Sequence, residues 1–242
     1  MTPRWKHSPP GSHWGEFGPD DRLGRMNLVT PAKVRQGMAE VREGLTFCLS
    51  LPLDVPGGRA LNARRLPPRL YGTLRDGASA GAQGFCWSYA SEDPALTDVV
   101  CDEVMLMNTQ YSTQWDSLAH IGSRFDADGD GEAEAVFYNG FRAGTDLHPG
   151  ATDTHASTDW ARYPDPDAGA LGVANLAVHG VQGRGVLIDL DKHIGRQRVA
   201  VGYEQLMHIL DADQIAVETG DMVCLHTGYA DTLLAMHKQP DV

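Results

Sequence analysis

The feature that most constrains the fold is the alternation of short apolar runs with a helical run in the last quarter of the chain. The runs "GVLIDL" (185–190) and "DMVCLHTG" (221–228) have the length and composition of buried strands, and "GYEQLMHILDA" (202–212) between them reads as a helix. Earlier runs at 45–53, 84–90, 103–116 and 134–140 also predict strands. A strand-rich first part followed by this alternation predicts an α/β or α+β fold with a mixed sheet. The 242 residues, 42% of them hydrophobic, supply one sizeable core, which favours a single domain.

Capping residues and a Pro/Gly-rich start set the expected organisation of the chain. Residues 1–29 are rich in proline, glycine and charge, and we expect an N-terminal arm that lies over a domain formed by residues 30–242. Thr30 can cap a helix that has Pro31 in its first turn and that we expect to end at Gly44. Further helices are predicted at 171–180 and 230–238. The Pro/Gly/Arg-rich stretch 54–82 predicts a long connection, and connections of that size usually have a function.

The charge of the chain argues against two classes of partner. The formal net charge is -12, and the acidic residues are spread along the chain. Such a balance disfavours nucleic acids and anionic membranes as partners and favours solubility. The N-terminus has no apolar run of the secretory type, and no run reaches the length that crosses a bilayer. We therefore expect a soluble, cytoplasmic protein.

The cysteines give no sign of a disulfide framework or a metal site. They are far apart in sequence, form no CxxC pair, and lie in or beside strand-like apolar runs; they are Cys48, Cys86, Cys101 and Cys224. That placement is typical of buried, reduced thiols, and we predict this state for each of them.

The segment "NTQYSTQWDSLAH" (108–120) is the strongest candidate for a functional site. If residues 108–116 are extended, alternate side chains share one face, and this face presents Gln110, Ser112, Gln114 and Asp116. A single helical turn beginning at Asp116 then brings His120 back over that carboxylate. Two amide oxygens, a carboxylate and an imidazole at one place are suitable metal ligands and acid–base groups. The alternative interpretation is an exposed edge strand with a polar outer face.

This segment resembles the signature HxGTHxDxPxH of the cyclase superfamily, which includes bacterial kynurenine formamidases and isatin hydrolases. The stretch "QYSTQWDSLAH" aligns with that signature without a gap. Other segments resemble the longer members of the superfamily in the same order: "WGEFGPDDRLGRMNLVTPAKV", "HGVQGRGVLIDL" and "GDMVCLHTGY". The resemblance implies one α/β domain with a central barrel-like or mixed sheet flanked by helices. It also implies a divalent metal, zinc or manganese, and assembly into homodimers or homotetramers.

The same resemblance assigns roles to residues of the segment. Gln110 and Gln114 stand where the family has metal-binding histidines, Asp116 matches its metal-binding carboxylate, and His120 matches its catalytic base. An amide oxygen is a harder and weaker ligand than an imidazole nitrogen, so the two glutamines should weaken zinc binding strongly. Three alternatives remain open: a harder ion such as manganese or magnesium binds here, residues elsewhere hold the metal, or no metal binds. The family also has a late metal-binding His and Glu beyond "HTGY", which we expect in any extension past Val242.

The function implied by the resemblance is metal-dependent hydrolysis of an amide, formamide or lactam-like carbonyl, that is, of a C–N bond other than a peptide bond, as in arylformamidases. A metal-activated water would be the nucleophile, with His120 as general base. Two alternatives come from other classes. One is a binding protein that kept the scaffold and lost its metal ligands, and the other is a metal-free cyclase or dehydratase that uses Asp116 and His120.

Two further groups of residues are candidate sites. The run "DADGDG" (126–131) spaces three aspartates like the start of a calcium loop, but Phe137 stands where such a loop has its glutamate. An Asp/Gly turn is therefore the favoured interpretation. The other group consists of histidines that we interpret as structural, although any of them could complete a site: His148, His155, His179 and His226.

Overall fold

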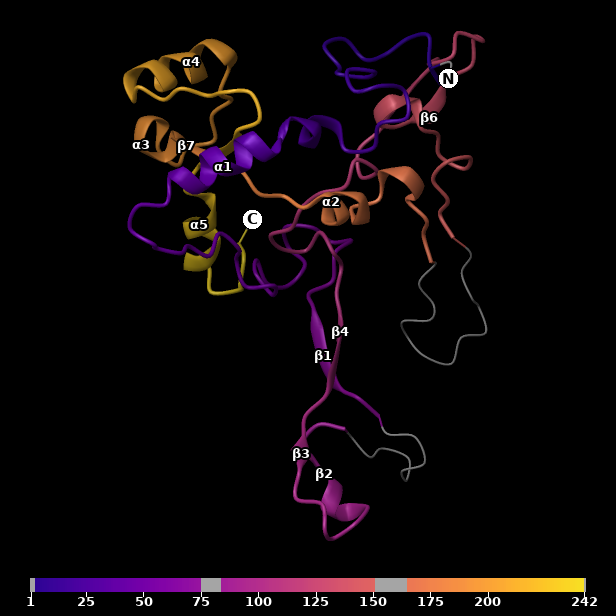
Figure 1. Ribbon diagram of the computed structural model, residues 1–242, viewed down its shortest axis with the longest axis vertical. Coiled ribbons are helices and arrows are strands. Elements are labelled where there is room, and N and C mark those ends of the chain that lie inside the picture. The colour runs from indigo at the N-terminus through magenta and orange to yellow at the C-terminus, as the bar shows by residue number, and fades with distance from the viewer. Residues whose placement is uncertain (1–2, 75–83, 151–164, 242) are drawn as a thin grey trace. The chain divides into compact units, whose positions relative to one another are not determined.

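The computed structural model describes residues 3–74, 84–150 and 165–241 (Figure 1). Its helices are α1 (Pro31–Ala39), α2 (Ala174–His179), α3 (Leu190–Ile194), α4 (Tyr203–Ala212) and α5 (Tyr229–Ala235). Its strands are β1 (Arg69–Gly72), β2 (Trp87–Ser88), β3 (Val99–Val100), β4 (Glu103–Leu106), β5 (Ser123–Phe125), β6 (Glu134–Val136), β7 (Gly185–Asp189) and β8 (Met222–His226). The chain divides into two compact units: unit 1 contains residues 1–48 and 115–229, and unit 2 contains residues 49–114 and 230–242. None of the described helices is both long and apolar enough to cross a bilayer.

The core of unit 1 is built on the strand–helix–strand region that the sequence predicted. β7 and β8 pair in parallel, from Gly185 opposite Met222 to Asp189 opposite His226. Buried side chains of β7, α3 and α4 pack together, with partly buried neighbours around them: Ile188, Leu190, Ile209 and Leu210, surrounded by Ile194, Leu206 and Ile215. Figure 1 shows α3, α4 and β7 grouped together. This region confirms the predicted α/β class, although the described strands form two-stranded sheets and no closed barrel.

A network of buried charges ties α1 to the starts of β7 and β8. The Asp221 side chain is fully buried, and its oxygens lie 3.0 Å from Lys33 Nζ and 2.6 Å from Arg184 Nη1. Lys33 itself is buried on α1 and also contacts Glu218 at 3.1 Å. The approach is close because Gly37 of α1 has no Cβ, and a Cβ there would lie 2.5 Å from the carbonyl group of Gly183. The network therefore requires both the charges and the absence of a side chain at residue 37.

The remaining sheets are antiparallel pairs. In unit 1, β5 and β6 pair from Ser123 opposite Val136 to Phe125 opposite Glu134. In unit 2, β1 pairs with β4 and β2 pairs with β3 (Figure 1). The buried side chains described for unit 2 are Val55, Tyr111 and Leu233.

Several sequence predictions about elements were correct in kind and wrong in extent. Thr30 caps α1 through its Oγ1, as expected, but the helix ends at Ala39 rather than near Gly44. The strand predicted at 84–90 is reduced to β2, because the Ser88 side chain accepts a hydrogen bond from Ala90 N and starts a 3₁₀ turn. β8 was predicted to be buried, yet Leu225 is 53% exposed, since the core of unit 1 covers only one face of the β7–β8 pair.

Two predictions about apolar runs were wrong. Residues 45–53 were expected to form a strand, but they have no regular structure, and no described strand pairs with them. The cysteines were expected to be buried. They are free thiols, as predicted, but Cys48, Cys86 and Cys101 are exposed and Cys224 is half-buried. Both errors have the same cause: apolar composition predicts burial only where another element supplies a surface to pack against.

Removal of the buried carboxylate tests the charge network. We expect Asp221→Ala to lower the free energy of unfolding by about 3–5 kcal/mol, because two cations lose their buried partner. Lys192→Ala is the control: it removes an ion pair with Asp213 in which Lys192 is 59% exposed, and should cost less than about 1 kcal/mol. Urea unfolding of both variants measures the difference. Equal losses would show that Asp221 does not hold the network.

The pH dependence of stability gives a second test of the same carboxylate. Burial acts to raise the pKa of Asp221, but the backbone N–H of Glu218, Lys33 and Arg184 outweigh burial and bring the pKa below its ordinary 3.8. A carboxylate whose pKa is lowered in the folded state contributes stability that is fully present above the unfolded-state pKa and is lost as the pH falls through the folded-state pKa. The stability difference between wild type and Asp221→Asn should therefore narrow from about pH 5 downward. A constant difference in urea unfolding from neutral to strongly acidic pH would contradict this assignment.

Candidate functional site

The turn after Trp115 contains the predicted acid–base pair. His120 Nδ1 is hydrogen-bonded to Asp116 Oδ1, as the predicted turn requires. The turn is closed by His120 N, which donates to Ser117 O at 3.0 Å. Ser117 Oγ accepts from Ala119 N at 3.1 Å and donates to Leu171 O at 2.7 Å, which anchors the turn to the chain before α2. The contact between Asp116 and His120 is thus confirmed, whereas their catalytic roles stay predictions.

The geometry of this pair fixes which imidazole nitrogen is basic. An ionised carboxylate can only accept hydrogen bonds, so His120 Nδ1 carries the proton in the contact with Asp116. In a neutral imidazole with its proton on Nδ1, the other nitrogen, Nε2, carries the lone pair that can accept a proton. The side chains are 34% and 48% exposed, for His120 and Asp116 respectively, so the pair adds little to stability. Its arrangement is that of a general base held by a carboxylate.

Asp116 also lines a cavity of about 270 Å³ in unit 1. The wall is formed by the turn itself, the N-terminal region and the end of β6; the lining includes Pro9, Trp14, Ser117, Leu118, Ile121 and Phe137. A mostly apolar and aromatic wall with one carboxylate is typical of a small-molecule site at the lower end of the usual size range. The cavity is therefore the place where a substrate could approach Asp116; its lining includes this member of the pair and not His120.

Tyr138 forms another part of the cavity wall. Its hydroxyl group donates a hydrogen bond of 2.8 Å to Asp21 Oδ2. Burial and this bond to Asp21 raise the pKa of Tyr138 well above its ordinary value. The hydroxyl therefore keeps its proton near neutral pH and serves as a fixed donor rather than a base.

Gln110 and Gln114 belong to unit 2, and their segment is not the strand that the sequence predicted. Residues 109–113 form turns and bends. Side-chain groups hold them in place: Ser112 Oγ donates to Pro52 O at 2.9 Å, and Thr113 Oγ1 accepts from Leu51 N at 3.0 Å. Such side-chain-to-backbone bonds compete with a strand ladder. The predicted alternation of faces is therefore wrong. In an extended segment Trp115 would point to the packed face, opposite Gln114 and Asp116, but its side chain is 61% exposed.

The predicted metal ligand Gln110 already has a cation beside it. Arg65 Nη2 donates to Gln110 Oε1 at 3.2 Å, and Arg65 Nη1 contacts Gln110 O. As donors, Gln110, Gln114 and Asp116 offer only oxygen, a set that suits manganese or magnesium rather than zinc. The convergence of both glutamines with Asp116 and His120 stays a prediction.

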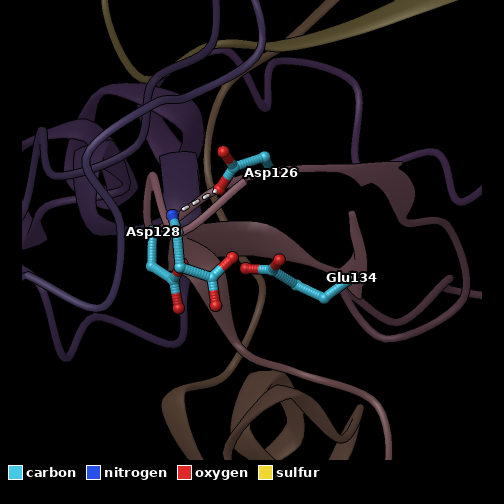
Figure 2. Close-up of side chains that lie close together, drawn as sticks. Asp126, Asp128 and Glu134 are labelled. Atoms are coloured by element: carbon cyan, nitrogen blue, oxygen red, sulfur yellow. Dashed lines mark hydrogen bonds between the residues drawn. The ribbon is translucent and has the colours of Figure 1, made fainter. Parts of the chain in front are cut away.

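A cluster of acidic side chains lies on the β5–β6 hairpin of unit 1 (Figure 2). One carboxylate oxygen from each of Asp126, Asp128, Asp130 and Glu134 lies within 4.8 Å of the others. The predicted Asp/Gly turn is confirmed, since the Asp126 carboxylate accepts hydrogen bonds from the backbone N–H groups of Gly129, Asp130 and Gly131. Glu134 was not predicted as a member. Its position three residues after Gly131, at the start of β6, was the available signal.

The charge of this acidic cluster is partly neutralised by an arginine. Arg142 Nη2 lies 2.9 Å from Asp128 Oδ2 and 3.0 Å from Glu134 Oε1. Burial acts to raise the pKa of Asp126, but the backbone N–H groups of the turn outweigh burial and hold the pKa below its ordinary value. Asp126 is therefore ionised near neutral pH. The cluster could bind a metal ion, for which Arg142 is the competing cation.

The other histidines have separate environments. His226 Nδ1 lies 2.8 Å from Asp189 Oδ1, at the C-terminal ends of β7 and β8, a pairing that the sequence reading missed. The sequence signal for this contact was that Asp189 and His226 each lie near the end of an apolar, strand-like run. The backbone of His148 pairs with that of Asp167, His179 ends α2, and His155 lies outside the described residues. The interpretation of His148 and His179 as structural stays a prediction.

Comparison with known proteins places this architecture in a family. Residues 47–241 match the family model described as "Putative cyclase". The chain belongs to the cyclase family. A crystal structure described as a novel cyclase is similar to this chain, with 24% sequence identity and a TM-score of 0.63. The similarity covers 92% of this chain and 64% of that chain, and it confirms the mixed α/β fold.

Among curated proteins, no match to this cyclase was found. The choice of reaction and substrate depends on the site, because one fold supports many functions.

The role of Arg142 as a competing cation can be tested by metal titration. Arg142→Gln should bind Ca²⁺ or Mn²⁺ at least about tenfold more tightly than wild type, because a positive charge next to the carboxylates is removed. Arg124→Gln, which makes the same charge change on neighbouring β5, is the control and should leave the affinity near that of wild type. Isothermal titration calorimetry gives both affinities. Unchanged affinity in Arg142→Gln would mean that Arg142 does not compete with the cation, and the absence of binding in both proteins would mean that the acidic cluster is not a cation site.

Proposed function

We propose that this member of the cyclase family is a hydrolase, which cleaves the C–N bond of an amide, formamide or lactam-like carbonyl compound. The observation that carries the proposal is the contact between His120 Nδ1 and Asp116, with Asp116 in the wall of a cavity of about 270 Å³. A base held by a carboxylate beside a cavity is the minimum that general-base hydrolysis requires. The proposed substrate class follows from the resemblance of this segment to arylformamidases and isatin hydrolases.

In the proposed reaction the pair activates water. His120 Nε2 takes a proton from a water molecule as its oxygen attacks the carbonyl carbon, and Asp116 stabilises the imidazolium that forms. The imidazolium then gives the proton to the leaving nitrogen as the C–N bond breaks. Water is consumed, the products are an acid and an amine, and His120 returns to its neutral form. The apolar wall formed by Trp14 and Phe137 would hold the substrate and limit access of bulk water.

A divalent metal is a proposed partner in this reaction. Gln110, Gln114 and Asp116 are the residues that would hold it, and their oxygen donors suit manganese better than zinc. When bound, such an ion polarises a carbonyl group and lowers the pKa of water. We further propose that the protein works in the cytoplasm on a small molecule, as a homodimer or homotetramer.

One observation favours a second candidate, metal-free acid–base catalysis such as cyclisation or dehydration. The Asp116–His120 contact needs no metal, and the guanidinium of Arg65 lies on the amide oxygen of Gln110 that a metal would require. A bound metal would have to displace Arg65 from that oxygen. The effect of added metal on turnover distinguishes the two candidates.

The proposal predicts the consequence of removing the base. With N-formylkynurenine or isatin as substrate, His120→Ala should lower kcat/KM by about 10²–10⁴-fold, the usual contribution of a positioned general base. His193→Ala is the matched control, because it removes another histidine that contacts a carboxylate, Asp213 at 2.7 Å, away from the cavity. Steady-state rates are measured with manganese, with zinc, and after chelation.

Each result of that experiment has a defined meaning. Full activity in His120→Ala would show that His120 is not the base. Activity that survives chelation would favour the metal-free candidate. No turnover of either substrate by wild type under any metal condition would contradict the proposed hydrolase.

A further inference from the structure

Two thiols lie next to each other at the end of the β2–β3 pair in unit 2. Trp87 pairs with Val100, so the register continued by one residue puts Cys86 opposite Cys101. The two Sγ atoms are 3.3 Å apart. A disulfide bond is about 2.05 Å long, so the sulfurs need to approach by only about 1.3 Å to be joined. The pairing of β2 with β3 therefore already holds the two sulfurs close to the distance of a disulfide bond.

The surroundings of the pair favour reaction rather than inert packing. Both cysteines are exposed, so that a small oxidant can reach them. The backbone N–H of Cys86 donates to Cys101 Sγ at 3.3 Å, which favours Cys101 as the attacking sulfur. The hydrogen bond to Cys101 and the charge of that sulfur raise the pKa of the Cys86 thiol, so Cys86 keeps its proton longer. Cys86 also has a φ of 57°, a value that residues other than glycine rarely adopt.

We propose that Cys86 and Cys101 are a redox modification site, at which peroxide converts the adjacent thiols into a reversible intramolecular disulfide. The pair lies outside the cavity wall and contains none of the residues assigned to hydrolysis. This proposal is independent of the proposed function, since it depends only on the two sulfurs and their strands.

The chemistry balances with peroxide as the oxidant. The Cys101 sulfur attacks one oxygen of hydrogen peroxide, the O–O bond breaks, and a sulfenic acid and water form. The Cys86 sulfur then attacks the Cys101 sulfur, the S–O bond breaks, and a second water leaves. In total, two thiols lose two hydrogens and two electrons, and one peroxide is reduced to two waters. A dithiol reductant reverses the reaction by exchange.

The link would fix a part of unit 2 whose strands are short. The two-stranded β2–β3 sheet has only two residues in each strand, and such isolated pairs are marginally stable. A bond between residues that are 15 positions apart would close the whole segment from Cys86 to Cys101 into a ring. Oxidation is therefore expected to slow cleavage by proteases within residues 87–100.

The experiment uses the full chain, reduced and then treated with hydrogen peroxide. Thiols that react with Ellman's reagent should fall from four to two, and peptide mapping without reductant should find Cys86 joined to Cys101. Dithiothreitol should restore all four. Cys48→Ser, which removes another exposed thiol, should still form the link, whereas Cys86→Ser should not form it.

A second measurement on the wild-type chain avoids dependence on the variants. Phenylarsine oxide bridges neighbouring thiols, so it should protect Cys86 and Cys101 from iodoacetamide while Cys48 is still alkylated. Links scattered among the four cysteines, links only between chains, or oxidation of Cys86 and Cys101 to separate sulfinic acids would each overturn the proposal. Equal alkylation of all three exposed cysteines in the presence of the arsenical would also overturn it.

Discussion

The carboxylate of Asp221 is fully buried and binds two cations. The three residues come from three segments of unit 1 that are far apart in sequence. Lys33 comes from α1, Arg184 precedes β7, and Asp221 itself precedes β8. A buried carboxylate without cations would cost several kcal/mol, so the two cations and Asp221 are held together as one group. β7 and β8 begin beside this network, and their parallel register brings Asp189 opposite His226 at the other end of the strands.

The candidate site depends on local geometry in the same unit. Residues 116–120 form one turn, in which a spacing of four brings the imidazole of His120 to the carboxylate of Asp116. The anchor of this turn is Ser117, whose hydroxyl binds Leu171 O. The cavity beside Asp116 then combines a polar group with an aromatic wall. The proposed hydrolysis requires that His120 takes a proton from water and returns it to the leaving nitrogen, which an imidazole held by a carboxylate can do.

Local signals in the sequence predicted part of this structure well. The cap at Thr30, the strands β7 and β8, helix α4 and the Asp116–His120 contact all follow from patterns over a few residues. Features that depend on distant partners were missed. The residues at 45–53 have strand composition but no described partner strand, and residues 109–113 turn because their side chains bind the backbone near Pro52. In the same way, nothing in the spacing of the four cysteines indicated that pairing of β2 with β3 would bring Cys86 and Cys101 together.

The central claim is that Asp116 holds the His120 imidazole with its proton on Nδ1, so that Nε2 is the base. Proton and nitrogen NMR of the histidine rings in the ¹⁵N-labelled protein tests this claim directly. We expect a low-field Nδ1–H resonance for His120 that disappears in Asp116→Asn, together with an unprotonated Nε2 in the neutral ring. A His120 ring that carries its proton on Nε2, or whose resonances do not change in Asp116→Asn, would contradict the account.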